Sequence, residues 1–389
     1  MKVHPSAAAL TAFLAALTLA GCQAKEPAST DSGETSGATA APAEITVEAS
    51  DTSCVLSGTE GTTGANTFVV TNNGNKVTEF YVYSEGERVM GEVENISPGL
   101  QRKLIVQLTQ PGTYTTACKP GMIGDGIRGE FTVTGDEVQI DTEGKFKEAA
   151  DSYKRYVNSQ VEALVPAVEA FVAAVKAGDI EAAKAQYPTS RVYYERIEPV
   201  AESFPNDLDP RIDLREADLE PGQQWTGFHR LEKDLWVDGL QPDTNAIADQ
   251  LVADVKELQA GVSAPDFTID STQIAGGAQG LLDEIATSKI SGEEDIFSHT
   301  DLWDFNANLQ GSQTAVASVR PILDERNPDL GQRVDQRFEE VEALLEKYRE
   351  GDGFVSYDKV TEPERQELSR AIDALSKEVS QVQGVIAPQ

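Results

Sequence analysis

The segment 129–178 reads GEFTVTGDEVQIDTEGKFKEAADSYKRYVNSQVEALVPAVEAFVAAVKAG, and its hydrophobic period changes part-way along. In GEFTVTG (129–135) apolar and polar residues alternate, which is the pattern of a half-buried β-strand. From Phe146 to Val175 apolar side chains instead recur every three or four residues, as on the buried face of a helix. This change of period predicts a boundary between an all-β domain and an all-α domain near residue 144.

The strand pattern extends back through residues 44–140. Apolar and polar residues alternate between Gly, Asn and Pro turns in the segments ITVEA (45–49), TFVVTNN (67–73), EFYVYSEG (79–86), KLIVQL (103–108) and GTYTTAC (112–118). Short strands at this spacing are typical of a sandwich of two sheets, so we predict an antiparallel β-sandwich over 44–140.

The helical pattern continues through residues 145–389. Apolar residues at helical spacing recur, mostly with Gly or Pro between the segments, in 179–186, 190–203, 223–238, 244–260, 271–290, 299–325, 331–349 and 362–384. We predict an all-α domain of packed antiparallel helices.

Residues 1–22 have the form of an export signal. An apolar run at 7–19 is too short to cross a bilayer as a helix of the mature protein, and it ends in LAGC (19–22). A small residue before a cysteine at the cut resembles the lipobox of bacterial lipoproteins, which implies a lipid on Cys22; the alternative is an ordinary secretory signal. Residues 23–43 lack large apolar residues, which predicts a flexible linker. We therefore expect a protein outside the cytoplasm, in a periplasm or at a cell surface, anchored to the membrane by lipid.

The charge of the chain is strongly negative. Lysine and arginine total 32 against 65 aspartate and glutamate residues, a net charge of −33. Such a chain repels phosphate backbones, so nucleic acid is excluded as a natural partner. It attracts cations, and carboxylate oxygens suit hard metal ions. The alternative interpretation is that the charge serves solubility alone.

The only histidines after the predicted signal are His229 and His299. In GFHRLE (227–232) an imidazole and a carboxylate stand three residues apart, so on a helix His229 and Glu232 share one face and could hold one ion. A zinc peptidase motif H-E-x-x-H would need Glu at 230 and His at 233, where this chain has Arg and Lys. We therefore expect a binding protein and no enzyme, with a metallopeptidase as the alternative.

Two further groups of carboxylates accompany this motif. Glu195, Glu198 and Glu202 are spaced as one stripe on a helix, which could face the His229 helix across a bundle. A second acidic set lies near His299 and consists of Glu293, Glu294, Asp301 and Asp304. It could be a second site or a set of helix caps.

Three segments together resemble a known family. GFHRLEKDLW (227–236), RVYYERIEP (191–199) and SHTDLWDFNANLQGSQ (298–313) are similar to the imelysin-like domain of EfeO-type iron-uptake lipoproteins. The resemblance implies a metal site at His229 and Glu232, joined less directly by Glu195 and Glu198. It implies iron as Fe2+ or Fe3+, with copper or zinc as alternatives, and as partners the iron permease and the Dyp-type haem peroxidase of an EfeUOB-type system.

The N-terminal half resembles the cupredoxin-like domain that precedes the imelysin-like domain in these proteins. The similarity lies in TNNG (71–74), PGTY (111–114) and CKPGM (118–122). A blue-copper site is excluded, because residues 44–140 contain no histidine. The resemblance implies Cys54, Glu79 and Cys118 as ligands of a non-blue copper or iron site. Two cysteines in an exported domain predict a disulfide equally well, and a module that oxidises ferrous iron is a further alternative.

Overall fold

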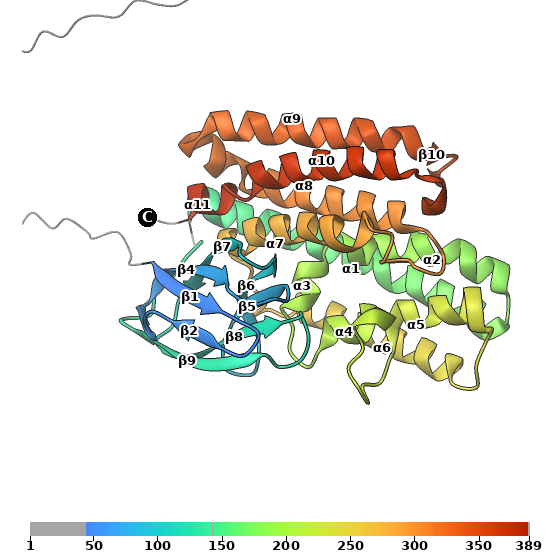
Figure 1. The fold of residues 1–389 in the computed structure, drawn as a ribbon, viewed down its shortest axis with the longest axis horizontal. Helices are drawn as coiled ribbons and strands as arrows, with labels where there is room; N and C mark the ends of the chain where they lie inside the picture. The colour runs from blue at the N-terminus through green and yellow to red at the C-terminus, as the bar shows by residue number, and fades with distance from the viewer. Residues whose placement is uncertain (1–43, 142, 388–389) are drawn as a thin grey trace, which may run out of the picture. The chain divides into compact units, whose positions relative to one another are not determined.

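The computed structural model describes residues 44–141 and 143–387. The predicted signal, Cys22 and the predicted linker lie outside these residues. Strands β1 to β9 occupy 45–134. The regular elements within 144–386 are helices apart from one hairpin of two-residue strands, β10 (Arg349–Glu350) and β11 (Gly353–Phe354), so the predicted order of a β-sandwich followed by a helical region is confirmed (Figure 1). No helix within the described part of the chain is long and apolar enough to span a bilayer.

The sandwich consists of two sheets. One has the order β2-β1-β4-β7, and its strands are Cys54–Leu56, Ile45–Ala49, Gly64–Asn72 and Gln101–Leu108. The other has the order β3-β9-β8-β5-β6, and its strands are Glu60–Thr62, Ile127–Thr134, Gly112–Pro120, Thr78–Tyr83 and Val89–Ile96. Phe68 of the first sheet lies between Phe80 and Phe131 of the second, with ring centroids 5.2 Å away in each case. These buried rings form the centre of the sandwich core.

The expectation of a wholly antiparallel sandwich is wrong in two pairings. β1 runs parallel to β4, and β3 runs parallel to β9. Alternation along a strand shows which face is buried, but it carries no information about the direction of the neighbouring strand.

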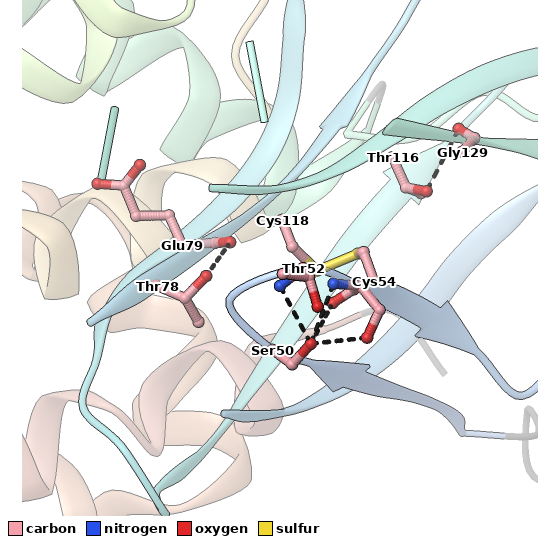
Figure 2. Close-up of a disulfide and its surroundings, with 9 residues drawn as sticks. Ser50, Thr52, Cys54, Thr78, Glu79, Thr116, Cys118 and Gly129 are labelled. Atoms are coloured by element: carbon pink, nitrogen blue, oxygen red, sulfur yellow. Dashed lines mark hydrogen bonds between the residues drawn. A yellow bond between two sulfur atoms is a disulfide. The ribbon is translucent and has the colours of Figure 1, made fainter. Parts of the chain in front are cut away.

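A disulfide joins the two sheets of the sandwich. Cys54 of β2 and Cys118 of β8 are bonded, at a sequence separation of 64 residues (Figure 2). Of the two alternatives for these cysteines, the structure therefore has the disulfide. Because β2 is a three-residue strand at the edge of its sheet, the bond fixes an element that few backbone hydrogen bonds hold.

The helical region is built around the long helix α1 (Gly144–Ala177), which packs against α2 (Ile180–Glu195), α6 (Thr244–Val262) and α8 (Asp301–Arg326). α9 (Pro328–Leu345) packs against both α8 and α10 (Glu362–Val379), as Figure 1 shows. The remaining helices are α3 (Glu198–Glu202), α4 (Leu208–Asp213), α5 (Gly227–Lys233), α7 (Ser271–Glu284) and α11 (Val382–Ile386). Single π-helical turns, Asp234–Asp238 and Ile285–Lys289, extend α5 and α7.

The helix boundaries around Pro188 differ from the prediction. The sequence predicts separate helices over 179–186 and 190–203, but α2 continues through Pro188 to Glu195. A proline inside a helix removes one backbone hydrogen bond. Tyr187 and Tyr194, which lie before and after the proline, are both buried in the core. α2 ends at Glu195, and Glu198 and Glu202 belong to the next helix, α3. The three carboxylates of the predicted stripe therefore do not lie on one helix.

We predict that Cys54→Ala combined with Cys118→Ala lowers the free energy of unfolding of the sandwich by about 2–4 kcal/mol, because an open chain gains entropy when unfolded. Urea unfolding followed by tyrosine fluorescence measures this. Helical circular dichroism in the absence of urea should stay unchanged. An equally stable double variant would contradict a structural role for the bond.

Candidate metal centre

The centre of the helical region contains a buried arginine surrounded by carboxylates. Arg191 of α2 is 0% exposed, and its guanidinium contacts carboxylates from α2, α4, α8 and the segment before α8. The partners are Glu195 at 2.6 Å, Glu294 and Asp304 at 3.2 Å, Asp295 at 3.9 Å, and Asp213 in the shortest contact. A single buried cation thus joins five carboxyl groups from distant parts of the sequence.

A second buried cation lies beside the first. Lys289, in the π-helical turn after α7, is 0% exposed. Its Nζ lies 3.3 Å from Glu294, 3.6 Å from Glu195 and 3.7 Å from Glu198, and 3.3 Å from Glu284 at the edge. We call the buried carboxylates around these two cations and His229 the acidic cluster; it comprises Glu195, Glu198, Asp213, Glu232, Glu294, Asp295 and Asp304.

His229 lies within the acidic cluster with carboxylates at both ring nitrogens. Its Nδ1 is 3.2 Å from Glu232 Oε2, one helical turn along α5. Its Nε2 is 3.5 Å from Asp213 Oδ1 and 3.5 Å from Glu294 Oε1. The side chain is 2% exposed, and Nε2 has no hydrogen-bond partner among the described residues. A buried ring nitrogen without a partner is costly unless something else binds it.

The Nδ1 side of the ring is occupied by fixed protein groups. Glu232 Oε1 accepts hydrogen bonds from the backbone N–H groups of Phe297 (3.1 Å) and Ser298 (2.7 Å). The Tyr187 hydroxyl donates to Asp295 at 2.9 Å and lies 3.4 Å from Nδ1. Both oxygens of Glu232 are therefore engaged, one by the backbone and one by the imidazole.

A glycine allows α5 to begin against the end of α4. Gly227 has φ of +85°, and a Cβ there would lie 2.1 Å from the carbonyl oxygen of Ile212. Only glycine tolerates both the backbone angle and this approach. Because Asp213 follows Ile212 and His229 lies two residues after Gly227, the close approach brings the imidazole to this carboxylate.

Burial and crowding shift the pKa values of the cluster. Burial and Arg191 oppose charge on His229, but Asp213, Glu232 and Glu294 outweigh them and raise its pKa to about 10.

Burial raises the pKa of Glu195 to about 8, although Lys289 and Arg191 favour its charged form. Burial likewise holds the pKa of Asp304 well above its usual range, against the effect of Arg191. Lys289 and His229 overcome burial at Glu294 and keep its pKa well below the usual range. Without a metal ion, the cluster therefore holds protons near neutral pH.

Two triads in the cluster have ligand atoms close enough for one cation. Asp213, His229 and Glu294 form one, and His229, Glu232 and Asp295 form the other, each with ligand atoms within 4.8 Å of one another. One imidazole with several carboxylate oxygens suits divalent or trivalent iron, manganese and zinc, so the donor set fits a cation of this class.

The structure brings some of the predicted ligands together and separates others. His229 and Glu232 meet, as the H-x-x-E spacing predicts. Glu195 and Glu198 belong to the same cluster, but they do not contact the imidazole. Glu195 contacts Arg191 and Lys289, and Glu198 contacts Lys289.

The predicted ligands of the sandwich do not converge. Cys54 and Cys118 are bonded to each other, and the Glu79 carboxylate points away from the bond (Figure 2). Cys118 pairs with Phe80, and both side chains face the core. Glu79 precedes Phe80 in β5, and successive side chains of a strand point to opposite faces, so Glu79 faces away from the core.

Sequence reasoning missed Asp213, Asp295 and the two buried cations. The acidic set near His299 is neither a separate site nor only a set of caps, because Glu294 and Asp304 belong to the same cluster as His229. His299 and Glu293 do not belong to it. The available signal was the density of acidic residues in GEEDIFSHTDLWD (292–304); nothing in the sequence singles out Asp213.

Comparison with known proteins gives the same two-part organisation. A family model for the Cupredoxin-like domain matches residues 9–133, and one for Imelysin matches 149–382. Proteins called iron uptake system component EfeO, from Escherichia coli and Shigella flexneri, are 42% and 41% identical over 351 residues, which is 88% of this chain and 91% of each relative. The chain belongs to the EfeO family. The EfeO relatives are named for uptake, whereas the name of the Imelysin model places it among peptidases.

Among solved structures, a reduced auracyanin from Roseiflexus castenholzii is 15% identical. It covers 25% of the EfeO-family chain and all of its own, with a TM-score of 0.21.

We predict that Gly227→Ala destabilises the protein by at least about 2 kcal/mol, because alanine is strained at this backbone angle and its Cβ meets the Ile212 carbonyl. Thermal unfolding by circular dichroism measures the loss. Gly58→Ala is the matched control, since no atom lies within 4 Å of its Cβ position. Equal melting temperatures for the two variants would show that the approach of α5 to α4 does not depend on glycine.

A second prediction concerns pH. In the metal-free protein the raised pKa of His229 contributes stability below about 6.5, and this contribution is lost as pH rises toward about 10. The stability advantage of the wild type over His229→Gln should therefore shrink by more than about 1 kcal/mol across this range, since one unit of pKa difference corresponds to about 1.4 kcal/mol. Urea unfolding at several pH values tests this. The same trend should persist in His299→Gln, and an advantage that grows with pH would refute a charged His229.

Proposed function

We propose that the chain captures iron outside the cytoplasm in the acidic cluster around His229 and passes it to a membrane permease. The names of the EfeO relatives support iron as the cargo. The composition of the cluster supports the place of binding, because oxygen donors with one imidazole suit iron in either valence.

The observation that carries the proposal is the imbalance of buried charge. Seven carboxyl groups, each no more than 8% exposed, surround two permanently charged side chains, Arg191 and Lys289. A protonated His229 adds a third positive charge, and Arg215 approaches Glu294 to 3.6 Å from the edge of the cluster. Buried carboxylates are expensive unless each is paired, so the cluster retains a deficit of positive charge. A metal cation supplies that charge.

Protons fill the deficit in the absence of metal. Burial raises the pKa of Glu195 to about 8, so this group holds a proton near neutral pH when no cation is present. Burial shifts the pKa of Asp304 in the same direction. Metal ions displace such protons, so iron binding should strengthen as pH rises and weaken in acid. This competition also provides a route for release.

The remaining features of the proposal concern delivery. A lipid on Cys22 and a flexible linker at 23–43 would keep the binding region near the membrane, which raises its effective concentration at a permease. The net charge of −33 would draw cations toward the surface. The haem peroxidase of the same uptake system is proposed as a second partner.

We expect no enzymatic activity from the cluster. A peptidase of the zincin type needs a second histidine at the metal, and His299 does not contact the acidic cluster. The oxidation of ferrous iron by the sandwich has no supporting ligand set either, since its two cysteines form a disulfide.

Iron binding tests the proposal directly. We predict that the wild type binds iron, supplied as Fe(II) or as ferric citrate, and that His229→Gln and Asp213→Asn each bind at least tenfold more weakly because a ligand or its charge is lost. Equilibrium dialysis with iron analysis measures the affinities. Glu339→Gln removes one exposed carboxylate and is the matched control for charge. Undiminished binding by His229→Gln, or no binding by the wild type, would refute the proposal.

A further inference from the structure

The sandwich and the helical region have separate hydrophobic cores. Each buried apolar cluster of the described residues belongs entirely to one region or to the other. Polar contacts join the two regions, and Arg102 of β7 forms an ion pair with Asp283 of α7. The Gln383 amide bonds to the backbone N–H (3.3 Å) and C=O (3.2 Å) of Ile105. Regions that share no core are expected to move relative to each other when such contacts weaken.

Carboxyl groups from both regions meet at this interface. Glu92 and Glu94 of β6 and Glu202 of α3, which we call the interface carboxyls, line a cavity of about 530 Å³ bordered by β6, β7, α3 and α7. The side chains of Glu92 and Glu202 are hydrogen-bonded to each other. Glu92 Oε2 is buried and has no hydrogen-bond partner that could donate to it among the described residues. Because an ionised carboxylate can only accept, one carboxyl of this pair must carry a proton.

A second shared proton connects Glu94 to the neighbouring strand β5. The Tyr81 hydroxyl lies 3.0 Å from Glu94 Oε1 and 3.1 Å from Glu79 Oε2. A phenol has one proton to donate, so one of these two carboxyls must be protonated if both contacts are hydrogen bonds.

The interface carboxyls have no ion-pair partner in the described part of the chain. The ion pairs of the sandwich are instead Arg102–Asp283, Lys103–Glu44 and Arg128–Glu87. Lys119 favours the charged form of Glu92, and its Nζ lies 4.0 Å from the centroid of the Tyr81 ring. The other cations that border the cavity are Arg88, Arg102, Lys103 and Lys377. The remaining titratable groups around the interface carboxyls are the phenols Tyr81 and Tyr83 and the acids Glu79, Glu198, Asp209, Glu284 and Asp373.

We propose that the sandwich docks on the helical region through protonated interface carboxyls, so that the two regions are closed in acid and separate as pH rises. Deprotonation places negative charges side by side where water is partly excluded, and separation returns each of them to water. α3 begins at Glu198 of the acidic cluster and ends at Glu202, so separation uncovers the helix that borders this cluster. The inference does not depend on the proposed function.

The direction of the pH dependence follows from the docked state. Burial raises the pKa of Glu92 from its ordinary 4.5 to about 7, although Lys119 favours its charged form. Burial, Glu94 and Glu92 hold the pKa of Glu202 well above its usual range. A raised pKa favours docking fully below the value of the separated state, and this contribution is lost as pH rises through the docked value. Between about 4.5 and about 7, the ratio of docked to separated molecules therefore falls by up to about tenfold per pH unit for each proton.

Small-angle X-ray scattering of the full chain in EDTA, from about pH 4.5 to about pH 9, tests the proposal. We expect a constant radius of gyration in acid and a rise as pH increases, with unchanged helical circular dichroism. A radius that stays constant over the whole range, or that rises on acidification, overturns the proposal. A rise accompanied by loss of helicity also overturns it, because the chain then unfolds.

A triple variant identifies the protons responsible. Glu92→Gln, Glu94→Gln and Glu202→Gln together supply neutral amides that can hydrogen-bond at every pH, so this protein should remain compact throughout. The matched control carries Glu85→Gln, Glu130→Gln and Glu339→Gln, which remove three exposed carboxylates, and it should open as the wild type does. A triple variant that opens over the same pH range as the wild type overturns the proposal.

The backbone N–H of Ile105 provides a second measurement that needs no variant. It donates to Gln383 across the interface, so its protection from hydrogen exchange should fall as the regions separate. NMR of the wild type, corrected for the pH dependence of intrinsic exchange, measures this. The amides of β7 that bond to β4 should stay protected. An Ile105 amide that is equally protected at about pH 4.5 and about pH 9 contradicts proton-dependent docking.

Discussion

The helical region depends on one constraint, the burial of like charges around Arg191. Five carboxyl groups approach one guanidinium that has no contact with solvent. Removing such a cation leaves uncompensated buried charge, which is among the most destabilising changes a core can undergo. α2, α4, α8 and the segment before α8 must therefore meet at this residue, and their meeting brings His229 of α5 among the same carboxylates.

The same constraint is what supports the proposal that the cluster is a binding site as well as a core. A core needs only as many polar groups as can be satisfied internally, and replacing paired ions by apolar residues is often stabilising. Here the carboxylates outnumber their cations, and within the described part of the chain His229 Nε2 has no hydrogen-bond partner. A reversible binding site is expected to be less stable when empty, because the ligand supplies the missing positive charge when it binds.

More of the domain architecture than of the site could be predicted from the sequence. Period two followed by period 3.6 was enough for the order of the domains, and the H-x-x-E spacing placed His229 beside Glu232. The direction of β1 and β3 and the continuation of α2 through Pro188 were not accessible, because both depend on tertiary packing. Asp213 could not be predicted for the same reason. It lies near the imidazole because α4 and α5 approach each other closely at Gly227, where a Cβ would not fit. Sequence spacing predicts neighbours within one helix. The acidic cluster and its two cations instead come from α2, α3, α4, α5, the π-helical turn after α7, the segment before α8, and α8 itself.

Under the proposed function, the counter-ions also explain how the cluster binds and releases a cation without unfolding. Arg191 and Lys289 each contact at least two carboxylates that do not face His229 Nε2, so neither is released into an apolar environment when a metal ion enters. A proton on Glu195 adjusts the remaining charge, since burial raises the pKa of this carboxyl to about 8. In the proposed function, the metal-free and loaded states therefore differ by the exchange of a cation for protons within a fixed framework. A carrier must release its cargo. Exchange with protons permits this release, because the protons replace the positive charge of the departing ion.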